Sequence, residues 1–289
     1  MKKKDKGRVW WWISILIVAV AGLLAGFFLG MEQGREEAEK TPVEKTTPAL
    51  KKEPPAEAPV AKGPVAVPDP MELKSLDDKT YCDRMEQEIQ EYFRYLNQKG
   101  YVRHLGESLD TYARFKAMIR KLSARLPTPA GEGIDSEIIN DNIFFFFRVL
   151  DKNDLTLIRH ILKNEGDTLE PTLDLFYRWL TLGDRCPDPE AIRPSQGALY
   201  HYAGFFLNTI GGRSYLFRRP LGLRLLCSYY SLLILQEADK QGRNSYGVDV
   251  LPFIGPLSRE IALYPDFRFK QTYLKNLEEM EREYLRKRQ

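Results

Sequence analysis

An uninterrupted apolar run near the start of the chain constrains the fold more than any other feature. From Val9 to Met31 no side chain carries a charge. A helix of this length crosses a hydrocarbon core of about 30 Å. Three tryptophans open the run, where indole rings favour the headgroup level. We therefore expect residues 9–31 to form a single transmembrane helix.

The charges around this run predict its orientation. Residues 1–8 carry +4, whereas the rest of the chain sums to about −1, because the total is +3. The positive-inside rule keeps such a tail in the cytoplasm and sends the C-terminal part across the membrane. The sequence has no N-x-S/T glycosylation site, which favours a bacterial envelope. We expect a bacterial inner-membrane protein with a periplasmic C-terminal domain, whose near-neutral charge argues against nucleic acid as a partner.

The apolar run leaves two questions open. Ala19-Val20-Ala21 resembles a signal-peptide cleavage site, but the run continues past it to Leu29, which favours an uncleaved anchor. Gly22, Gly26 and Gly30 line one face of the expected helix, a spacing that lets two helix backbones approach closely. We expect this face to pack against a second copy, giving a homodimer, or against a partner helix. The general frequency of glycine in membrane helices is the alternative explanation.

Residues 32–70 have a different composition. They contain eight prolines, separated mainly by Ala, Glu, Lys and Val, and no aromatic residue. Such a segment buries too little apolar surface to offset its ordering entropy, so we expect a disordered, locally polyproline-like linker. Fully extended, it reaches on the order of 100 Å. The linker is expected to hold the body away from the membrane; a stalk without a function is the alternative.

Residues 71–289 are numerous enough to bury a core of their own. Apolar residues recur at steps of three and four, and no stretch alternates long enough to indicate a sheet. We expect an all-α domain of roughly seven to nine helices, arranged as an irregular multi-helix bundle or a degenerate helical solenoid. The main expected helices are Leu76–Lys99, Asp135–Leu150, Leu155–Lys163, Ser195–Ile210, Leu221–Lys240 and Phe267–Arg286. Asp167 and Glu170 predict a capping box for a further helix.

The cysteines and histidines give no sign of a metal or cofactor site. Cys82, Cys186 and Cys227 form no C-x-x-C pair, and His104, His160 and His201 are far apart in the sequence. We therefore expect no catalytic, cofactor-binding or metal-binding residues of a known motif. In an oxidising compartment one disulfide would form and one thiol would remain; three buried apolar cysteines are the alternative.

The most unusual part of the body is Ser195–Arg224. An aromatic-rich helix runs into a Gly-Gly pair, and four arginines then follow closely: Arg213, Arg218, Arg219 and Arg224. Because guanidinium groups suit carboxylate and phosphate partners, we expect a patch that docks an anionic partner. The alternative is that these arginines complement helix dipoles and pair with surface carboxylates.

Four consecutive phenylalanines, Phe144–Phe147, form a second unusual segment. One helix cannot direct four successive side chains inward. At least one of them is therefore expected to face a neighbouring helix, a partner or the membrane, unless the whole helix is buried.

The sequence thus predicts a non-catalytic protein that binds or scaffolds within a cell-envelope assembly. Its expected partners are the membrane and envelope proteins or a cell-wall polymer. The alternative is a cell-wall enzyme of the glycan-hydrolase type, which needs two carboxylates flanking a sugar bond. The obvious glutamates lie on charged helical faces, so the sequence does not favour this alternative.

Overall fold

The computed structural model describes residues 77–288 except 107–109, 130–134, 189, 191 and 210–220. These residues belong to a unit that spans Ala61–Gln289. Within them every regular element is helical, which confirms the all-α prediction. The predicted transmembrane helix, 9–31, and linker, 32–70, lie outside the described residues. Among the helices that are described, none is long and apolar enough to cross a bilayer.

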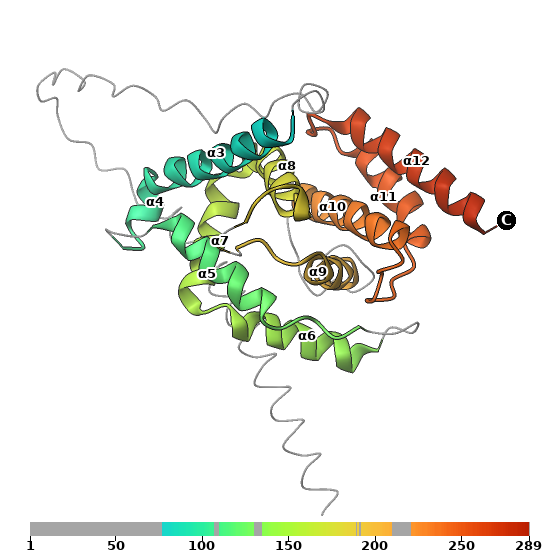
Figure 1. Cartoon of the computed structure of the whole chain (residues 1–289), viewed down its shortest axis with the longest axis horizontal. Helices are drawn as coiled ribbons and strands as arrows, with labels where there is room; N and C mark the ends of the chain where they lie inside the picture. The colour runs from blue at the N-terminus through green and yellow to red at the C-terminus, as the bar shows by residue number, and fades with distance from the viewer. Residues whose placement is uncertain are drawn as a thin grey trace, which may run out of the picture. The chain divides into compact units, whose positions relative to one another are not determined.

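The described residues form ten α-helices and two short 3₁₀ turns, η2 (Gly166–Thr168) and η3 (Gly183–Arg185). The helices are α3 (Asp78–Asn97), α4 (Gly100–Arg103), α5 (Thr111–Ser123), α6 (Ser136–Val149), α7 (Lys152–Asn164), α8 (Leu169–Leu180), α9 (Gln196–Thr209), α10 (Leu221–Lys240), α11 (Leu251–Leu263) and α12 (Lys270–Lys287). They pack as a helical bundle (Figure 1). The number exceeds the prediction because α4 and α11 were not expected from the sequence.

Helix α11 was missed because its prolines and glycine resemble helix breakers. Pro252 lies in the first turn, where a backbone N–H has no helical partner to lose. Pro256 lies further inside the helix, but its side chain is exposed, so water can reach the carbonyl that it leaves without a donor. The opposite face buries Ile254, Leu257 and Ile261, and this burial holds the helix.

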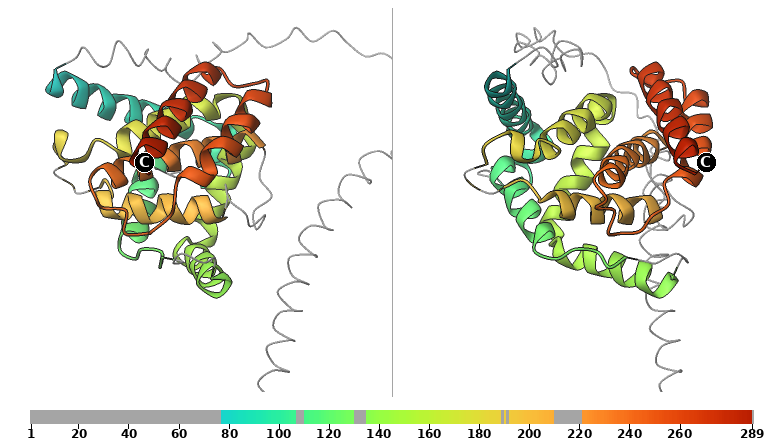
Figure 2. Two further views of the ribbon diagram at one scale, coloured as in Figure 1. Left: turned by 90° about the vertical axis from the view of Figure 1, so that its right-hand side faces the viewer. Right: turned by 45° about the vertical axis from the view of Figure 1, so that its right-hand side comes forward.

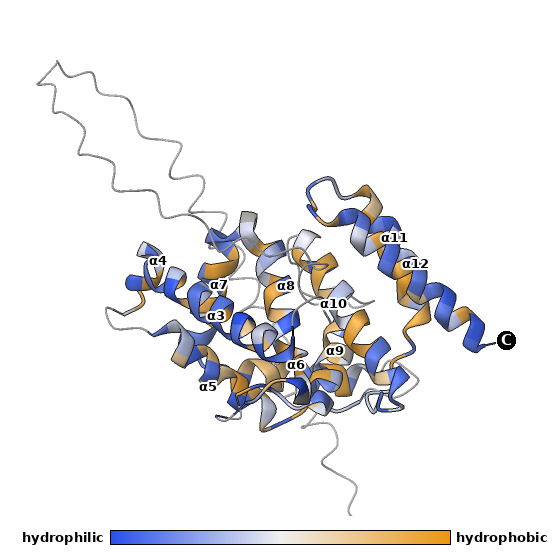
Figure 3. Cartoon of the chain, turned by 45° about the horizontal axis from the view of Figure 1, so that its top comes forward, coloured by the Kyte–Doolittle hydropathy of each residue, from blue (hydrophilic) through white to orange (hydrophobic). Residues whose placement is uncertain are grey.

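Two hydrophobic cores organise the bundle. The first joins α3 to α8 and the segment after it, around Ile89, Phe93 and Trp179. The second is formed by α9, α10, α11 and α12, and Leu225 and Leu235 are fully buried in it. In Figure 3 the hydrophobic colour is concentrated on α8, α9 and α10, whereas the end of α12 is hydrophilic. Figure 2 shows α11 and α12 side by side, and α9 between α6 and α10.

Helix α8 contributes to both cores. Leu175 and Trp179 lie in the first core, whereas Leu173 and Tyr177 pack against the second. Residues two apart on a helix point in nearly opposite directions, so these two pairs occupy opposite faces. The helix therefore joins the two halves of the body.

The predicted capping box at the start of α8 is wrong. The N-cap residue is Thr168, and no side chain caps this end. The Glu170 carboxylate instead accepts hydrogen bonds from the backbone N–H groups of Arg268 and Phe269, both at 2.8 Å, and from the Tyr273 hydroxyl at 2.9 Å. A glutamate that the sequence assigned to its own helix thus caps α12, about a hundred residues further along the chain.

The four phenylalanines of α6 do not all face inward. Phe146 packs against Phe205 and Phe206 of α9. The ring of Phe145 lies under the guanidinium of Arg125, and Phe144 is 70% exposed. The expectation that at least one ring faces a neighbouring helix is met by Phe146, and the alternative of complete burial does not hold for Phe144.

Two glycines of α9 provide a matched test of how closely this helix packs against Tyr246. A Cβ added at Gly204 would overlap the ring of Tyr246, whereas one added at Gly197 meets only the Ser195 hydroxyl, at 4.0 Å. Gly204→Ala should lower the free energy of unfolding by about 1–3 kcal/mol, as overpacking does. Gly197→Ala should raise it by up to about 1 kcal/mol, because alanine favours helix. Urea denaturation followed by circular dichroism measures both, and equal effects would contradict the Gly204–Tyr246 contact.

Candidate functional site

The structure describes only one residue of the predicted arginine patch. Gly22, Gly26, Gly30, Arg213, Arg218 and Arg219 lie outside the described residues. Arg224 lies in α10, and its guanidinium pairs with the Glu260 carboxylate of α11. For Arg224 the alternative interpretation, pairing with a surface carboxylate, therefore holds.

The three histidines occupy separate places in the bundle. His104 follows α4, His160 stacks on Tyr101, and His201 lies in α9. In the part of the chain that the structure describes, no three His, Cys, Asp or Glu residues come close enough to hold a metal ion.

His201 and Ser245 are as close as a catalytic base and its nucleophile, because the Ser245 Oγ lies 3.0 Å from His201 Nε2. The other ring nitrogen, Nδ1, is 2.9 Å from the carbonyl oxygen of Pro127. Because a carbonyl only accepts, Nδ1 carries the proton and the serine hydroxyl donates to Nε2. Acyl transfer also needs donors for an oxyanion, but the neighbouring N–H groups of Ser245 and Gly247 bond to Arg243 and Asn244. The pair instead fastens the turn after α10 to the loop after α5.

A disulfide joins Cys82 of α3 to Cys186, just after η3, across 104 residues. The sequence left open whether two cysteines pair or all three serve as buried apolar residues. The bond shows that Cys82 and Cys186 pair. Cys227 lies in α10. Arg185 reinforces the junction, because its guanidinium pairs with Asp78 and lies 4.3 Å from the ring centre of Tyr81. The start of α3 is thus fastened to the segment that follows α8 by a covalent bond and an ion pair.

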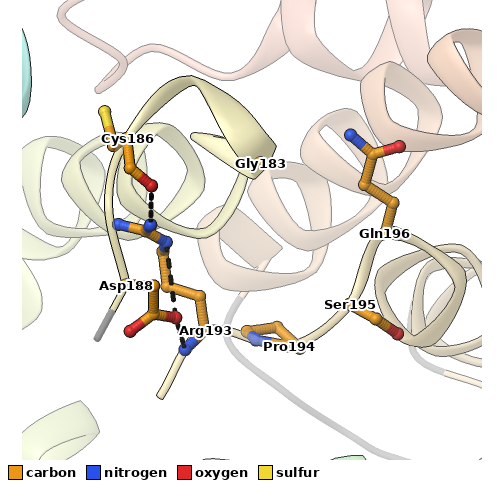
Figure 4. Close-up of a pocket in the computed structure, with 7 residues that line it drawn as sticks. All are labelled: Gly183, Cys186, Asp188, Arg193, Pro194, Ser195 and Gln196. Carbon is orange, nitrogen blue, oxygen red and sulfur yellow. Dashed lines mark hydrogen bonds and ion pairs between the residues drawn. The ribbon is translucent and has the colours of Figure 1, made fainter. Parts of the chain in front are cut away.

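A solvent-open pocket of about 330 Å³ lies beside the disulfide. Its lining residues come from the segment between α8 and α9 and from the first residue of α9: Gly183, Cys186, Asp188, Arg193, Pro194, Ser195 and Gln196 (Figure 4). The Arg193 side chain is only 8% exposed, and it donates to the carbonyl of Cys186 at 2.6 Å. Asp188 accepts from the backbone N–H groups of Ile192 and Arg193 at 3.0 and 2.8 Å. These polar groups hold the segment folded, rather than pointing toward a ligand.

The buried carboxylates follow the same pattern, because tyrosine hydroxyls bind them. Glu165 accepts from Tyr95 at 2.8 Å and from Tyr101 at 2.7 Å, and Glu170 accepts from Tyr273. Burial raises the pKa of Tyr101 and Tyr273, so both hydroxyls remain protonated donors. Each bond joins segments that are far apart in the sequence.

Glu86, which is only half-buried, also accepts three hydrogen bonds. From α3 it accepts hydrogen bonds from Tyr112 of α5 at 2.7 Å and from the indole N–H of Trp179 of α8 at 3.2 Å, together with one from Gln90. Burial alone would raise the pKa of Glu86, but these hydrogen bonds hold it below the ordinary value of 4.5. Glu86 is one of the glutamates that were expected on a charged helical face, because its partners Tyr112 and Trp179 come from helices that are distant in the sequence.

No protein-family model, curated protein or solved structure matches this chain. The function is therefore inferred from its own residues. The polar clusters that the structure describes hold helices together.

The disulfide should contribute strongly to stability. Closing a loop of about one hundred residues is worth about 4–5 kcal/mol in the chain-entropy model. We expect the double substitution Cys82→Ser and Cys186→Ser to lower the free energy of unfolding by that order, measured by urea denaturation under oxidising conditions. Cys227→Ser controls for the loss of a cysteine as such and should have a smaller effect. Non-reducing peptide mapping that linked Cys227 to either of the other two cysteines would contradict this pairing.

Glu86 predicts a specific pH dependence. Because its pKa is lower in the folded chain than in the unfolded chain, its stabilising effect is complete above about pH 4.5 and is lost as the pH falls through the folded pKa. Glu86→Gln should therefore cost about 1–3 kcal/mol at pH 7, with a difference from the native chain that shrinks below pH 4.5. Urea denaturation between pH 7 and pH 3 measures this difference. Glu278→Gln, on the exposed side of α12, is the control and should change the free energy of unfolding by less than about 0.5 kcal/mol.

Proposed function

We propose that this protein is anchored in a bacterial inner membrane by one helix, residues 9–31, and that its helical body lies in the periplasm. The observation that carries the proposal is the Cys82–Cys186 disulfide. Disulfides persist in oxidising compartments such as the periplasm and are rare in the cytosol. The basic tail, residues 1–8, independently favours the same orientation.

The proposed role is non-catalytic binding or scaffolding within an envelope assembly. The polar groups of the pocket and the buried carboxylates that we describe are engaged in holding the body folded, which favours a rigid binding module. Envelope proteins or a cell-wall polymer are the proposed partners, besides the membrane itself. Gly22, Gly26 and Gly30 would let the anchor pack as a homodimer.

The linker, residues 32–70, acts in this proposal as a spacer. Its prolines favour extended polyproline geometry, so the body works within a distance on the order of 100 Å from the anchor. A partner within that radius meets the body at a raised effective concentration, because tethering removes most of the search volume.

The anchor and its orientation can be tested together. The full chain, fused at its C-terminus to alkaline phosphatase, should remain in the membrane after alkaline extraction, because the apolar helix spans the bilayer. The phosphatase should be active, since it folds only where disulfides form. The same chain fused to a fluorescent protein that matures only in the cytoplasm serves as the reciprocal control. A soluble mature protein that begins at Gly22, or an inactive phosphatase, would disprove the proposed topology.

A further inference from the structure

Helix α6 lies at the edge of the bundle, where it contacts α5 and α9 (Figure 1, Figure 2). Of its residues only Ile139 and Asn142 are buried. The exposed residues of the helix lie on the opposite side, within one arc of about 140°, because successive residues are about 100° apart. They are Ser136, Glu137, Asn140, Asp141, Phe144 and Arg148. We call these six residues the outer face of α6.

An exposed ring divides the charges of this face. Phe144 is 70% exposed. Glu137 and Asp141 precede it by two turns and one turn, and Arg148 follows it by one turn. Within the described part of the chain, none of these three charged side chains forms an ion pair. The order of charges suits the helix dipole, but the dipole does not account for the exposed ring.

This face is complementary to itself. When two copies of α6 pack antiparallel with Phe144 on the two-fold axis, residues after the ring face residues before the ring in the second copy. Arg148 then lies about 1.5 Å along the helix axis from Asp141 of the second copy. Both residues lie on the same flank of the helix, about 20° apart, so the symmetry brings them together. The dimer gains two such ion pairs, and its two Phe144 rings meet at the axis.

The charges favour this arrangement over other occupants of the face. Parallel packing would place each charge against its own copy, and like charges repel. A uniformly basic partner would face Arg148 with a like charge. An anionic surface, such as a phospholipid bilayer, would repel Glu137 and Asp141. A second, antiparallel copy is opposed at neither end.

We infer that the outer face of α6 pairs with the same face of a second copy, antiparallel around Phe144. The inference goes beyond the proposed function, which places a homodimer contact in the anchor alone. One pair of 14-residue helices offers less than the roughly 800 Å² per partner of a standard interface, so the contact is weak in solution. Two bodies tethered to one bilayer meet at a raised effective concentration, which strengthens the contact. This strengthening rests on the proposed anchor, whereas the pairing of the two faces does not.

The test measures energy transfer between donor-labelled and acceptor-labelled full chains in vesicles of neutral lipid. Both chains carry Gly26→Ile, which prevents close packing of the proposed anchor helices, so that transfer reports contact between the bodies. The protein-to-lipid ratio at half-maximal transfer gives the strength of pairing. Asp141→Arg and Arg148→Asp should each raise this ratio on the order of tenfold, because each opposes like charges at two symmetric places.

The two single variants are complementary to each other. A donor-labelled Asp141→Arg chain mixed with an acceptor-labelled Arg148→Asp chain restores opposite charges at both places. The ratio should therefore return to within about threefold of the parent chain, a rescue that misfolded chains do not give. The matched controls, Asp83→Arg and Arg94→Asp, change exposed residues of α3 and should shift the ratio by less than about twofold, alone or mixed.

Phe144→Ser tests the ring at the axis. It should weaken pairing on the order of tenfold, because the dimer loses both rings. Leu263→Ser is the control; this α11 residue is 84% exposed, and its loss should weaken pairing by less than about twofold. Equal effects of these two substitutions would overturn the inference.

Two further results would also overturn it. One is a mixture of the Asp141→Arg and Arg148→Asp chains that transfers no more energy than either chain alone. The other is transfer that Gly26→Ile by itself abolishes, which would confine the contact to the anchor. A chain that the vesicles fail to retain would contradict the proposed anchor instead, and the same mixture in solution would then decide the pairing of α6.

Discussion

The body depends on α8, because this helix gives one face to each of two hydrophobic cores. Trp179 and Leu175 enter the core around α3, whereas Leu173 and Tyr177 enter the core around α10. A helix that is apolar on two opposite sides has no long solvent-facing stripe. Its polar residues must therefore find partners between the cores: Arg178 pairs with Asp174 at 2.9 Å, and Asp174 also accepts from the Tyr230 hydroxyl.

Burying acidic residues usually costs stability, and this protein offsets that cost with tyrosine. The buried Glu165 and Glu170, and the half-buried Glu86, each accept at least one hydrogen bond from a tyrosine hydroxyl of a distant helix. A tyrosine contributes apolar area to the core while its hydroxyl satisfies the carboxylate. Such bonds are directional, so they fix how neighbouring helices sit against each other. The same engagement explains why abundant carboxylates do not by themselves indicate hydrolytic chemistry in this chain.

The sequence predicted what local periodicity determines. Leu221–Lys240 was predicted and observed as α10, because the run of apolar residues has clear ends. Prediction from the sequence failed where a residue bonds to one that is distant in the chain. Glu170 was assigned to its own helix, but its carboxylate accepts hydrogen bonds at the start of α12. The prolines of α11 concealed the buried face of that helix. The pairing of Cys82 with Cys186, rather than Cys227, requires tertiary information.

The position of the disulfide acquires meaning from the proposed topology. Cys82 lies in the second turn of α3, close to where a chain arriving from the linker joins the body. A pull on the linker would otherwise peel α3 from the first core one turn at a time, because the end of a helix frays most readily. The disulfide passes such a pull directly to Cys186, and the Arg185–Asp78 ion pair holds the turn before it. In the proposed topology, the segment between α8 and α9, which the Arg193–Asp188 ion pair holds folded, would therefore form the base of the tether.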